Sequence, residues 1–232
     1  MDIGKSFTYM FEDPDWLRKL GIGTFVGLIG IVFSPILIGL IPLLMLMGYT
    51  LDVVRNTMDG RQLPLPEWED WGGFLVRGLK LFGAFFVWAL PMILIAIPLG
   101  IGSALVDNNG GGVEAFGTLL IVCGSCLMLL WGIFVALISP AIYVRLARTD
   151  RFGSAFEFGK LWAFTRDNIG NVIIAIILIW VAGLIAAIIA ALGVIALVIG
   201  LLVSIPFAML WQYLVQSHLF GQIALHSATP VD

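Results

Sequence analysis

The sequence GYTLDVVRNTMDGRQLPLPEWED, at residues 48–70, is the most polar passage between two long apolar blocks of this chain. The two blocks, residues 21–51 and 81–106, contain no Asp, Glu, Lys or Arg. Uncharged apolar runs longer than about 18 residues are typical of membrane-spanning segments. The sequence therefore predicts a polar connector between two membrane-embedded units, and the rest of the chain is interpreted around it.

The composition of the whole chain is that of an integral membrane protein. Hydrophobic residues make up 60% of its 232 residues, the mean hydropathy is +1.06, and 12% of the residues are charged. Two further charge-free runs occur at residues 115–144 and 172–217. These values lie outside the usual balance of a soluble domain. We therefore expect an all-α polytopic transmembrane helix bundle that forms a single domain. The net charge of −3 gives no reason to expect a nucleic-acid partner.

Prolines, glycines and charges divide the chain into about six membrane segments, with amphipathic helices at the membrane surface. The first two segments are predicted to be short and broken by proline, because Ser34, Pro35 and Pro42 interrupt residues 21–51. The last charge-free run is too long for one span, so a turn is expected near Gly193. Acidic residues near the N-terminus argue against a cleavable signal peptide. The predicted order is an interface helix at 1–20, a short hairpin or kinked span at 21–51, an elbow at 52–80, a span at 81–106, a loop at 107–114, a span at 115–147, an interface helix at 148–170, spans at 171–192 and 193–217, and a tail at 218–232.

The positive charges predict the side of the membrane that each connection faces. All twelve Lys and Arg residues fall in clusters at residues 5–19, 55–80 and 145–166, and the loop at 107–114 and the turn at Gly193 have none. By the positive-inside rule, the clusters and both termini are cytoplasmic, in the inner (plasma) membrane of the cell, and the two connections without Lys or Arg are external. This assignment favours a short hairpin for the first apolar block. The alternative is one kinked span that leaves the first cluster outside.

A weak internal repeat accompanies this plan. The sequence SPILIGLIPL is similar to LPMILIAIPL, so that Pro35 and Pro42 correspond to Pro91 and Pro98. An Asp-Trp pair followed by basic residues precedes each copy, and residues 151–167 form a further interface helix before the last charge-free run. We interpret the chain as an interface helix plus a membrane segment, used three times. Chance similarity between apolar sequences is the alternative.

The connector also carries a set of residues that resembles a family signature. It resembles the GY…RN…G…LPEW.D pattern of an uncharacterised family of bacterial and archaeal multi-pass membrane proteins, a domain of unknown function. The run FEDPDW at residues 11–16 is similar to the N-terminal pattern of that family. The resemblance implies a prokaryotic multi-pass membrane fold, and it implies no activity. The signature residues are Gly48, Tyr49, Arg55, Asn56, Gly60, Pro66, Glu67, Trp68, Asp70 and Gly78.

Two interpretations of the connector remain open. As a rigid linker, it ends a helix at Gly60, runs extended through its Leu-Pro-Leu-Pro sequence and places tryptophans at the level of the lipid headgroups. As a binding surface, it holds lipid headgroups or a protein partner. The residues expected to form such a surface are Arg55, Arg61, Trp68, Trp71, Arg77 and Lys80.

Elsewhere the sequence has no pattern typical of a catalytic or metal site. Cys123 and Cys126 form a C-x-x-C pair in an apolar run without a nearby His, Asp or Glu, so we interpret them as small packing residues. His218 and His226 follow the last charge-free run and are interpreted as interfacial residues. The membrane segments contain no ionisable residue of the kind that proton relays and carriers require. We therefore expect no catalytic residue, no bound metal and no cofactor.

These observations predict a non-enzymatic membrane scaffold or accessory subunit of a larger assembly. Its expected partners are membrane lipids and other membrane subunits or further copies of itself. The alternative is a transporter or permease-like protein for a neutral or lipidic substrate, which proline-broken segments at matching positions of a repeat would indicate. An enzyme with a site at the lipid surface is a third, less favoured interpretation.

Overall fold

The computed structural model describes residues 1–108 and 111–227 of the chain. Every regular element in these residues is a helix, which confirms the predicted all-α fold. Helices are labelled α, and short 3-10 helices are labelled η. In chain order the elements are α1 (Ile3–Thr8), η1 (Tyr9–Phe11), α2 (Trp16–Val32), η2 (Ser34–Ile36), α3 (Leu40–Met58), α4 (Trp71–Asn108), α5 (Gly112–Thr149), η3 (Phe152–Phe156), α6 (Phe158–Asp167), α7 (Ile169–Leu192), η4 (Gly193–Ala196) and α8 (Leu197–Leu225).

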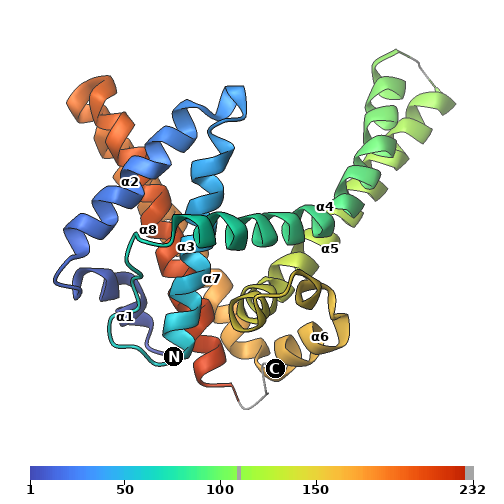
Figure 1. Cartoon of the computed structure of the whole chain (residues 1–232). Helices are drawn as coiled ribbons and strands as arrows, with labels where there is room; N and C mark the ends of the chain where they lie inside the picture. Colours follow the sequence, from blue (N-terminus) through green and yellow to red (C-terminus); the bar gives the residue numbers. More distant parts are fainter. Residues whose placement is uncertain (109–110, 228–232) are drawn as a thin grey trace.

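Six long helices form three hairpins that point in the same direction, with their turns at the top of Figure 1 and the N-terminus at the bottom. In the α2–α3 hairpin, Gly30 lies against the side chain of Leu43. In the α7–α8 hairpin, the hydroxyl of Ser204 donates a hydrogen bond of 3.0 Å to the carbonyl oxygen of Ala190. Helices α4 and α5 pack against each other in the same antiparallel manner. The fold is therefore three hairpins side by side.

The first apolar block folds back on itself and does not form one kinked helix. Leu37 has a φ of 61°, and the N–H of Gly39 donates to the carbonyl oxygen of Phe33 at 3.0 Å. A side chain at Gly39 would overlap the backbone of Phe33 and of Gly30, so only glycine fits this close approach. Pro35 lies in η2, outside both helices. The chain reverses between α2 and α3, near the proline where the sequence predicted a break.

The second unit differs from its prediction. Helix α4 is continuous from Trp71 to Asn108 and contains Pro91 and Pro98, so neither proline breaks it. A proline removes one backbone hydrogen bond, which a long apolar helix tolerates when neighbouring groups take up the freed carbonyl. Figure 1 shows that α4 bends along its length. Because α4 starts at Trp71, the predicted elbow at 52–80 shrinks to a connector of residues 59–70 between α3 and α4.

The ends of the other elements also refine the predicted plan. Helix α8 runs to Leu225, so residues 218–225 of the predicted tail are helical. The predicted interface helix at 1–20 consists of α1, η1 and the start of α2, and that at 148–170 consists largely of η3 and α6. The predicted loop at 107–114 lies partly outside the described residues. Short helices therefore precede the first and third hairpins, and an extended connector precedes the second.

Among the described residues, four helices are long and apolar enough to cross a membrane by length and composition: Trp71–Val106, Gly112–Thr149, Ile169–Ile195 and Gly200–Leu225. Helix α2 has 17 residues and α3 has 19, of which the latter includes Asp52 and Arg55. A helix of 17 residues is only about 26 Å long. The predicted count of six membrane segments therefore stays a prediction for these two.

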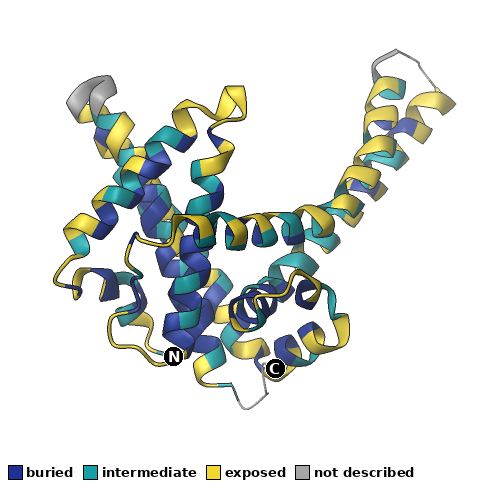
Figure 2. Ribbon diagram, in the orientation of Figure 1, coloured by how far each residue is buried: buried dark blue, intermediate teal, exposed yellow. Residues whose placement is uncertain are grey.

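Buried residues concentrate in the lower half of the molecule, and the upper ends of the hairpins are exposed (Figure 2). The buried core combines residues of α3, α8, the end of α5 and the start of α4, among them Tyr49, Phe74, Ile142 and Phe220. Outer surfaces of the hairpins are apolar, as Leu94 and Trp180 illustrate with exposed fractions of 67% and 77%. Such surfaces are expected to face lipid or other membrane helices.

Candidate functional site

The three basic clusters meet at the end of the molecule opposite the hairpin turns, which we call the basic end. Arg18 binds Glu67 at 2.6 Å, and Arg148 binds Asp59 at 3.0 Å, so the first and third clusters both contact the connector or its start. Lys80 on α4 also binds the carboxylate of Asp150 at 2.9 Å. The connector of residues 59–70 lies at this end of the bundle (Figure 1), and it is the candidate site that the sequence singled out.

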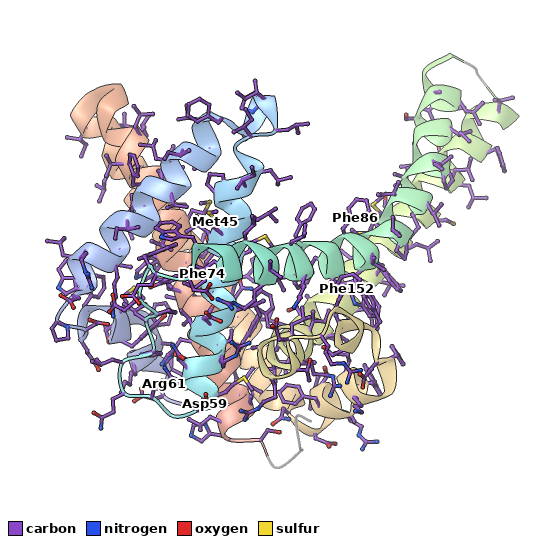
Figure 3. All side chains as sticks on the ribbon, in the orientation of Figure 1. Met45, Asp59, Arg61, Phe74, Phe86 and Phe152 are labelled. Atoms are coloured by element: carbon purple, nitrogen blue, oxygen red, sulfur yellow. The ribbon has the colours of Figure 1, made fainter. Side chains whose placement is uncertain are left out.

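Helices α3 and α4 cross in backbone contact just inside the basic end. A methyl group at Gly48 would overlap the carbonyl oxygen of Phe74, and one at Gly78 would overlap the carbonyl oxygen of Leu44. Figure 3 shows Phe74 at this crossing, with Met45 of α3 above it. Two glycines of the signature therefore allow the helices to touch, since any larger residue would separate them.

Two aromatic rings hold the connector against this crossing. Tyr49 stacks on Trp68 with ring centroids 4.2 Å apart, and its hydroxyl donates to the carbonyl oxygen of Pro66 at 3.1 Å. The indole N–H of Trp68 donates to the carbonyl oxygen of Lys19 on α2 at 2.9 Å. Trp68 is 8% exposed and Tyr49 is 1% exposed. These signature residues pack the connector between α2 and α3.

The end of α3 is fixed by a glycine cap. Gly60 has a φ of 70°, a conformation that favours glycine, and its N–H donates to the carbonyl oxygen of Thr57 at 3.0 Å. The N–H of Arg61 donates to the carbonyl oxygen of Asn56 at 3.0 Å, which completes a Schellman motif. The side chain of Asn56 donates to the carbonyl oxygen of Pro64 at 2.8 Å. The signature residues Asn56 and Gly60 thus set the direction in which the connector leaves α3.

A buried ion-pair network ties the connector to the N-terminal helices. The ammonium of Lys19 lies 2.7 Å from the carboxylate of Asp13 and 2.9 Å from that of Glu67, and it also donates to the carbonyl oxygen of Leu65 at 3.2 Å. Burial acts to lower the pKa of Lys19, but the hydrogen bonds to Asp13 and Glu67 outweigh it, so the pKa lies above its ordinary value. Lys19 is therefore held as a cation by two carboxylates.

A second network surrounds the start of α4. The carboxylate of Asp70 accepts the N–H of Gly73 and binds Arg77, both at 2.9 Å, so Asp70 caps the helix. The hydrogen bond with Arg77 holds the pKa of Asp70 below its ordinary value. Arg77 also binds Asp52 of α3 at 2.9 Å, across the helix crossing. Burial raises the pKa of Asp52, although Arg77 and Arg55 oppose the shift.

Most of the predicted surface residues therefore have internal partners. Arg55 donates to the carbonyl oxygen of Ala147 at 2.7 Å, Arg77 is paired with two carboxylates, and Lys80 is bound to Asp150. Trp68 is buried, and Trp71 is 37% exposed. Arg61 is exposed and has no side-chain partner among the residues that the structure describes. A lipid- or partner-binding role for the set stays a prediction, and Arg61 is the member with most free hydrogen-bonding capacity.

Sequence reasoning missed several charged residues that build this end. Asp13 and Lys19 were expected on an exposed interface helix, and both are buried. The guanidinium of Arg145 near the end of α5 is also buried, and it binds Glu157 at 2.7 Å and the carbonyl oxygen of Ser154 at 3.3 Å. The bonds of Arg145 fasten η3 and the start of α6 to α5. No local signal distinguishes these side chains from solvated ones, because their partners lie in other parts of the chain.

The cysteine residues lie on α5, and the histidine residues lie in the last turns of α8 and directly after it. Cys123 and Cys126 are free and exposed on α5, so they do not fill a helix interface within this chain. His218 is 4% exposed inside α8, where it stacks on Tyr9 with ring centroids 4.2 Å apart. It was expected at an interface after the last span, and instead it is part of the core. The residues that the structure describes contain no group of three metal-ligating side chains.

Four long apolar helices, three hairpins with their turns at one end and a basic end held by ion pairs define a polytopic helical membrane protein. The chain belongs to the family described as protein of unknown function (DUF4013), whose model matches residues 31–210. The match includes the connector and leaves out the FEDPDW run at residues 11–16. Neither the curated proteins nor the solved structures with which the chain was compared match it.

Proposed function

We propose that this protein is a non-enzymatic scaffold or accessory subunit of a membrane assembly. The observation that carries the proposal is the α4–α5 hairpin, which stands away from the other two hairpins over its upper half (Figure 1). Its large outer side chains are exposed, among them Leu94, Ile97, Phe116 and Leu119, with exposed fractions between 55% and 67%. An arm of this kind offers an apolar surface to the helices of another subunit.

The inner face of the same arm is closely packed and gives it a defined shape. A methyl group added to Gly102 would lie 2.8 Å from the carbonyl oxygen of Gly117, and one added to Gly117 would lie 2.8 Å from the carbonyl oxygen of Gly102. Gly124 lies against the side chain of Leu99. Close contact between small residues holds two membrane helices together without polar groups. The base of the arm is fixed by the α3–α4 crossing. A closely packed arm with an apolar outer surface supports a role in assembly more than a role in moving a solute.

The paired charges of the basic end support a non-enzymatic role. Its carboxylates and cations are largely engaged with one another, as in the Asp13–Lys19–Glu67 and Asp52–Arg77–Asp70 networks. A catalytic site needs a nucleophile or a base that can reach a substrate. Groups locked in ion pairs between helices are better suited to holding the helices in place.

The proposed location is the inner (plasma) membrane with both termini in the cytoplasm. Successive basic clusters are separated by one hairpin, α2–α3 or α4–α5, and so by an even number of crossings if all six helices span. An even number keeps every Lys and Arg on one side, as the positive-inside rule requires. A tag at residue 1 that is accessible only from the exterior would contradict this topology.

The alternative of a permease-like protein for a neutral or lipidic substrate has less support. Proline-broken segments at matching positions of the two units would indicate such a protein. Because α4 continues through Pro91 and Pro98, the two units do not share a broken helix. The apolar hollow of about 460 Å³ between α5 and α7 lies on the outer surface of the bundle and is lined by exposed residues such as Trp180. A lipid chain fills such a hollow as readily as a substrate does.

Photo-crosslinking from the natural cysteines tests the assembly role. Cys123 and Cys126 are exposed on the projecting arm, so an apolar thiol-reactive photo-crosslinker attached there samples the arm's neighbours in the native membrane. We expect a discrete crosslinked species that contains another membrane protein, identified by mass spectrometry and recovered in stoichiometric amount after purification in a gentle detergent. The variant Cys123→Ser/Cys126→Ser is the control and should give no such species. Crosslinks to lipid alone, with no protein recovered, would overturn the proposal.

A further inference from the structure

A polar pocket at the basic end joins three distant parts of the chain. It has a volume of about 230 Å³ and lies between the start of α1, the junction of α3 with the connector, and the last turns of α8. Its walls include Lys5, Arg61, Gln222 and His226. Pockets for drug-sized ligands hold about 300–1,000 Å³, so this pocket suits a smaller polar group. Figure 3 shows Arg61 at this lower end, near the N-terminus marked in Figure 1.

We propose that this pocket binds a phosphate group. Two cations face it, Lys5 and Arg61, against one carboxylate, that of Asp2. Among the described residues Arg61 has no side-chain partner, and the ion pair of Lys5 with Glu12 is long, at 3.8 Å. Guanidinium and ammonium groups form short charge-assisted hydrogen bonds with phosphate oxygens. The pocket therefore gathers cations with free donors, whereas Arg55, Arg77 and Lys80 nearby are already engaged.

The floor of the pocket is fixed before any ligand enters. The side-chain amide of Gln222 accepts the N–H of Asp2 at 2.7 Å and donates to the carbonyl oxygen of Asp2 at 3.1 Å. His218 lies 3.0 Å from the hydroxyl of Ser6, and Gln222 and His218 are both buried. These bonds dock the start of α1 onto α8. A preorganised wall reduces the ordering that binding requires.

The position of Arg61 is set in the same way. Its N–H closes the Schellman motif at the end of α3, directly after Gly60 with its φ of 70°. The backbone of Arg61 is thus anchored while its guanidinium is exposed. The carboxylate of Asp2 caps α1 by accepting the N–H of Lys5 at 3.0 Å, so its charge partly opposes the cations. On the other side, Nδ1 of His226 donates to the carbonyl oxygen of Gln222 at 2.9 Å, since a carbonyl can only accept.

Two sources supply a phosphate group at this place. The basic end is where the proposed topology puts the cytoplasmic leaflet, so an anionic phospholipid headgroup is one source. A soluble phosphate compound is the other. The same cations recognise both, and the experiment below separates them. Neither source depends on whether the protein is a scaffold.

The test uses the full chain, purified in neutral detergent, with inorganic phosphate as the first probe. Thermal unfolding is followed by tryptophan fluorescence during a phosphate titration at constant ionic strength. The second probe is a nanodisc that contains phosphatidylglycerol as a minority lipid in phosphatidylcholine, from which native mass spectrometry detects retained lipid. The variants are Arg61→Gln and Asp2→Asn, of which the second keeps the cap and removes the opposing charge. The matched control is Arg151→Gln, which removes another exposed arginine that does not line the pocket.

Binding in either arm supports the proposal if it follows the pocket residues. We expect Arg61→Gln to weaken binding roughly tenfold, as the loss of a charge-assisted contact predicts, Asp2→Asn to strengthen it, and Arg151→Gln to leave it unchanged. A phosphate-dependent rise in Tm indicates the soluble source. Retention of phosphatidylglycerol without that rise indicates the lipid source. No binding of either probe, or equal losses in Arg61→Gln and Arg151→Gln, would overturn the proposal.

Discussion

Replacing either glycine of the α3–α4 crossing with alanine should destabilise the protein by about 3 kcal/mol. A methyl at Gly48 would overlap the carbonyl oxygen of Phe74, and a methyl at Gly78 would lie 3.0 Å from the backbone nitrogen of Gly48 in addition to overlapping Leu44. Overpacking a tight interface costs about 1–3 kcal/mol. We place these variants at the upper end because the atoms in the way belong to the backbone, so whole helices must move.

Separation of the helices would also weaken the contacts that depend on the crossing. The Asp52–Arg77 ion pair, at 2.9 Å, joins α3 to α4, and Phe74 packs edge-on against Tyr49 with ring centroids 5.5 Å apart. Because one displacement relieves both clashes, the double variant Gly48→Ala/Gly78→Ala should cost much less than the sum of the two single variants. A non-additive result of this kind is expected for residues that share one interface.

Reversible unfolding in mixed micelles, by titration with SDS and detection by tryptophan fluorescence, measures the free energy of unfolding. The matched control is Gly100→Ala, on helix α4 like Gly78, where nothing lies within 4 Å of an added methyl. Alanine is the better helix former by about 0.5–1 kcal/mol, so the control should be neutral or slightly stabilised. If Gly48→Ala or Gly78→Ala unfolds at the same SDS fraction as Gly100→Ala, the close crossing is not what holds α3 to α4.

Three further predictions concern the polar end. Lys19→Met should cost about 3 kcal/mol in the same unfolding assay because it leaves the buried carboxylate of Asp13 without its cation. Arg18→Gln, which removes an exposed partner of Glu67, should cost less than about 1 kcal/mol. Equal costs would contradict the importance of the buried Asp13–Lys19 pair. Trp68→Phe should cost about 2 kcal/mol, since it removes a buried hydrogen bond and part of a ring stack, and Trp71→Phe at the exposed neighbour should cost clearly less. The pKa of Asp70 is lower in the folded protein than its ordinary value of about 4, so ionised Asp70 stabilises the fold. This stabilisation is fully present above the ordinary pKa and is lost as the pH falls through the lowered pKa. The Tm of the parent protein should therefore fall more steeply than that of Asp70→Asn between about pH 5 and about pH 2, and parallel curves would exclude this linkage.

The charge-free runs and the turn residues predicted much of the fold. A stretch without charges places a helix in the apolar layer whatever its neighbours do, which is why the membrane class and the reversals near Pro35 and Gly193 could be predicted. The continuity of α4 could not, because a proline breaks a helix only where its surroundings fail to satisfy the freed carbonyl. That information lies in the partner helices and not in the sequence around Pro91 and Pro98.

The candidate site was harder to predict than the fold. The sequence singled out residues 48–78, of which the structure places residues 59–70 in a connector and the rest in α3 and α4. It could not distinguish a binding surface from a packed joint. The sequence around Trp68 is typical of an interfacial tryptophan. In the structure its N–H donates to the carbonyl oxygen of Lys19, 49 positions away. The sequence predicts that His218 lies beyond the last span. In the structure α1 covers it. In both cases the deciding contact joins segments that are far apart in the chain.

The basic end thus combines two sets of residues whose roles can be separated by mutation. The signature residues Gly48, Tyr49, Trp68 and Gly78 lie inside a joint, so changes there should lower the unfolding free energy and leave the response to phosphate intact in the folded fraction. Arg61 follows the end of α3 and lines the pocket. Its change should therefore weaken the response to phosphate and leave the unfolding free energy intact. A joint variant that kept its stability but lost phosphate binding would show that the connector itself is the recognition surface. The two assays together therefore decide whether the polar residues between the first two hairpins build the fold or meet a ligand.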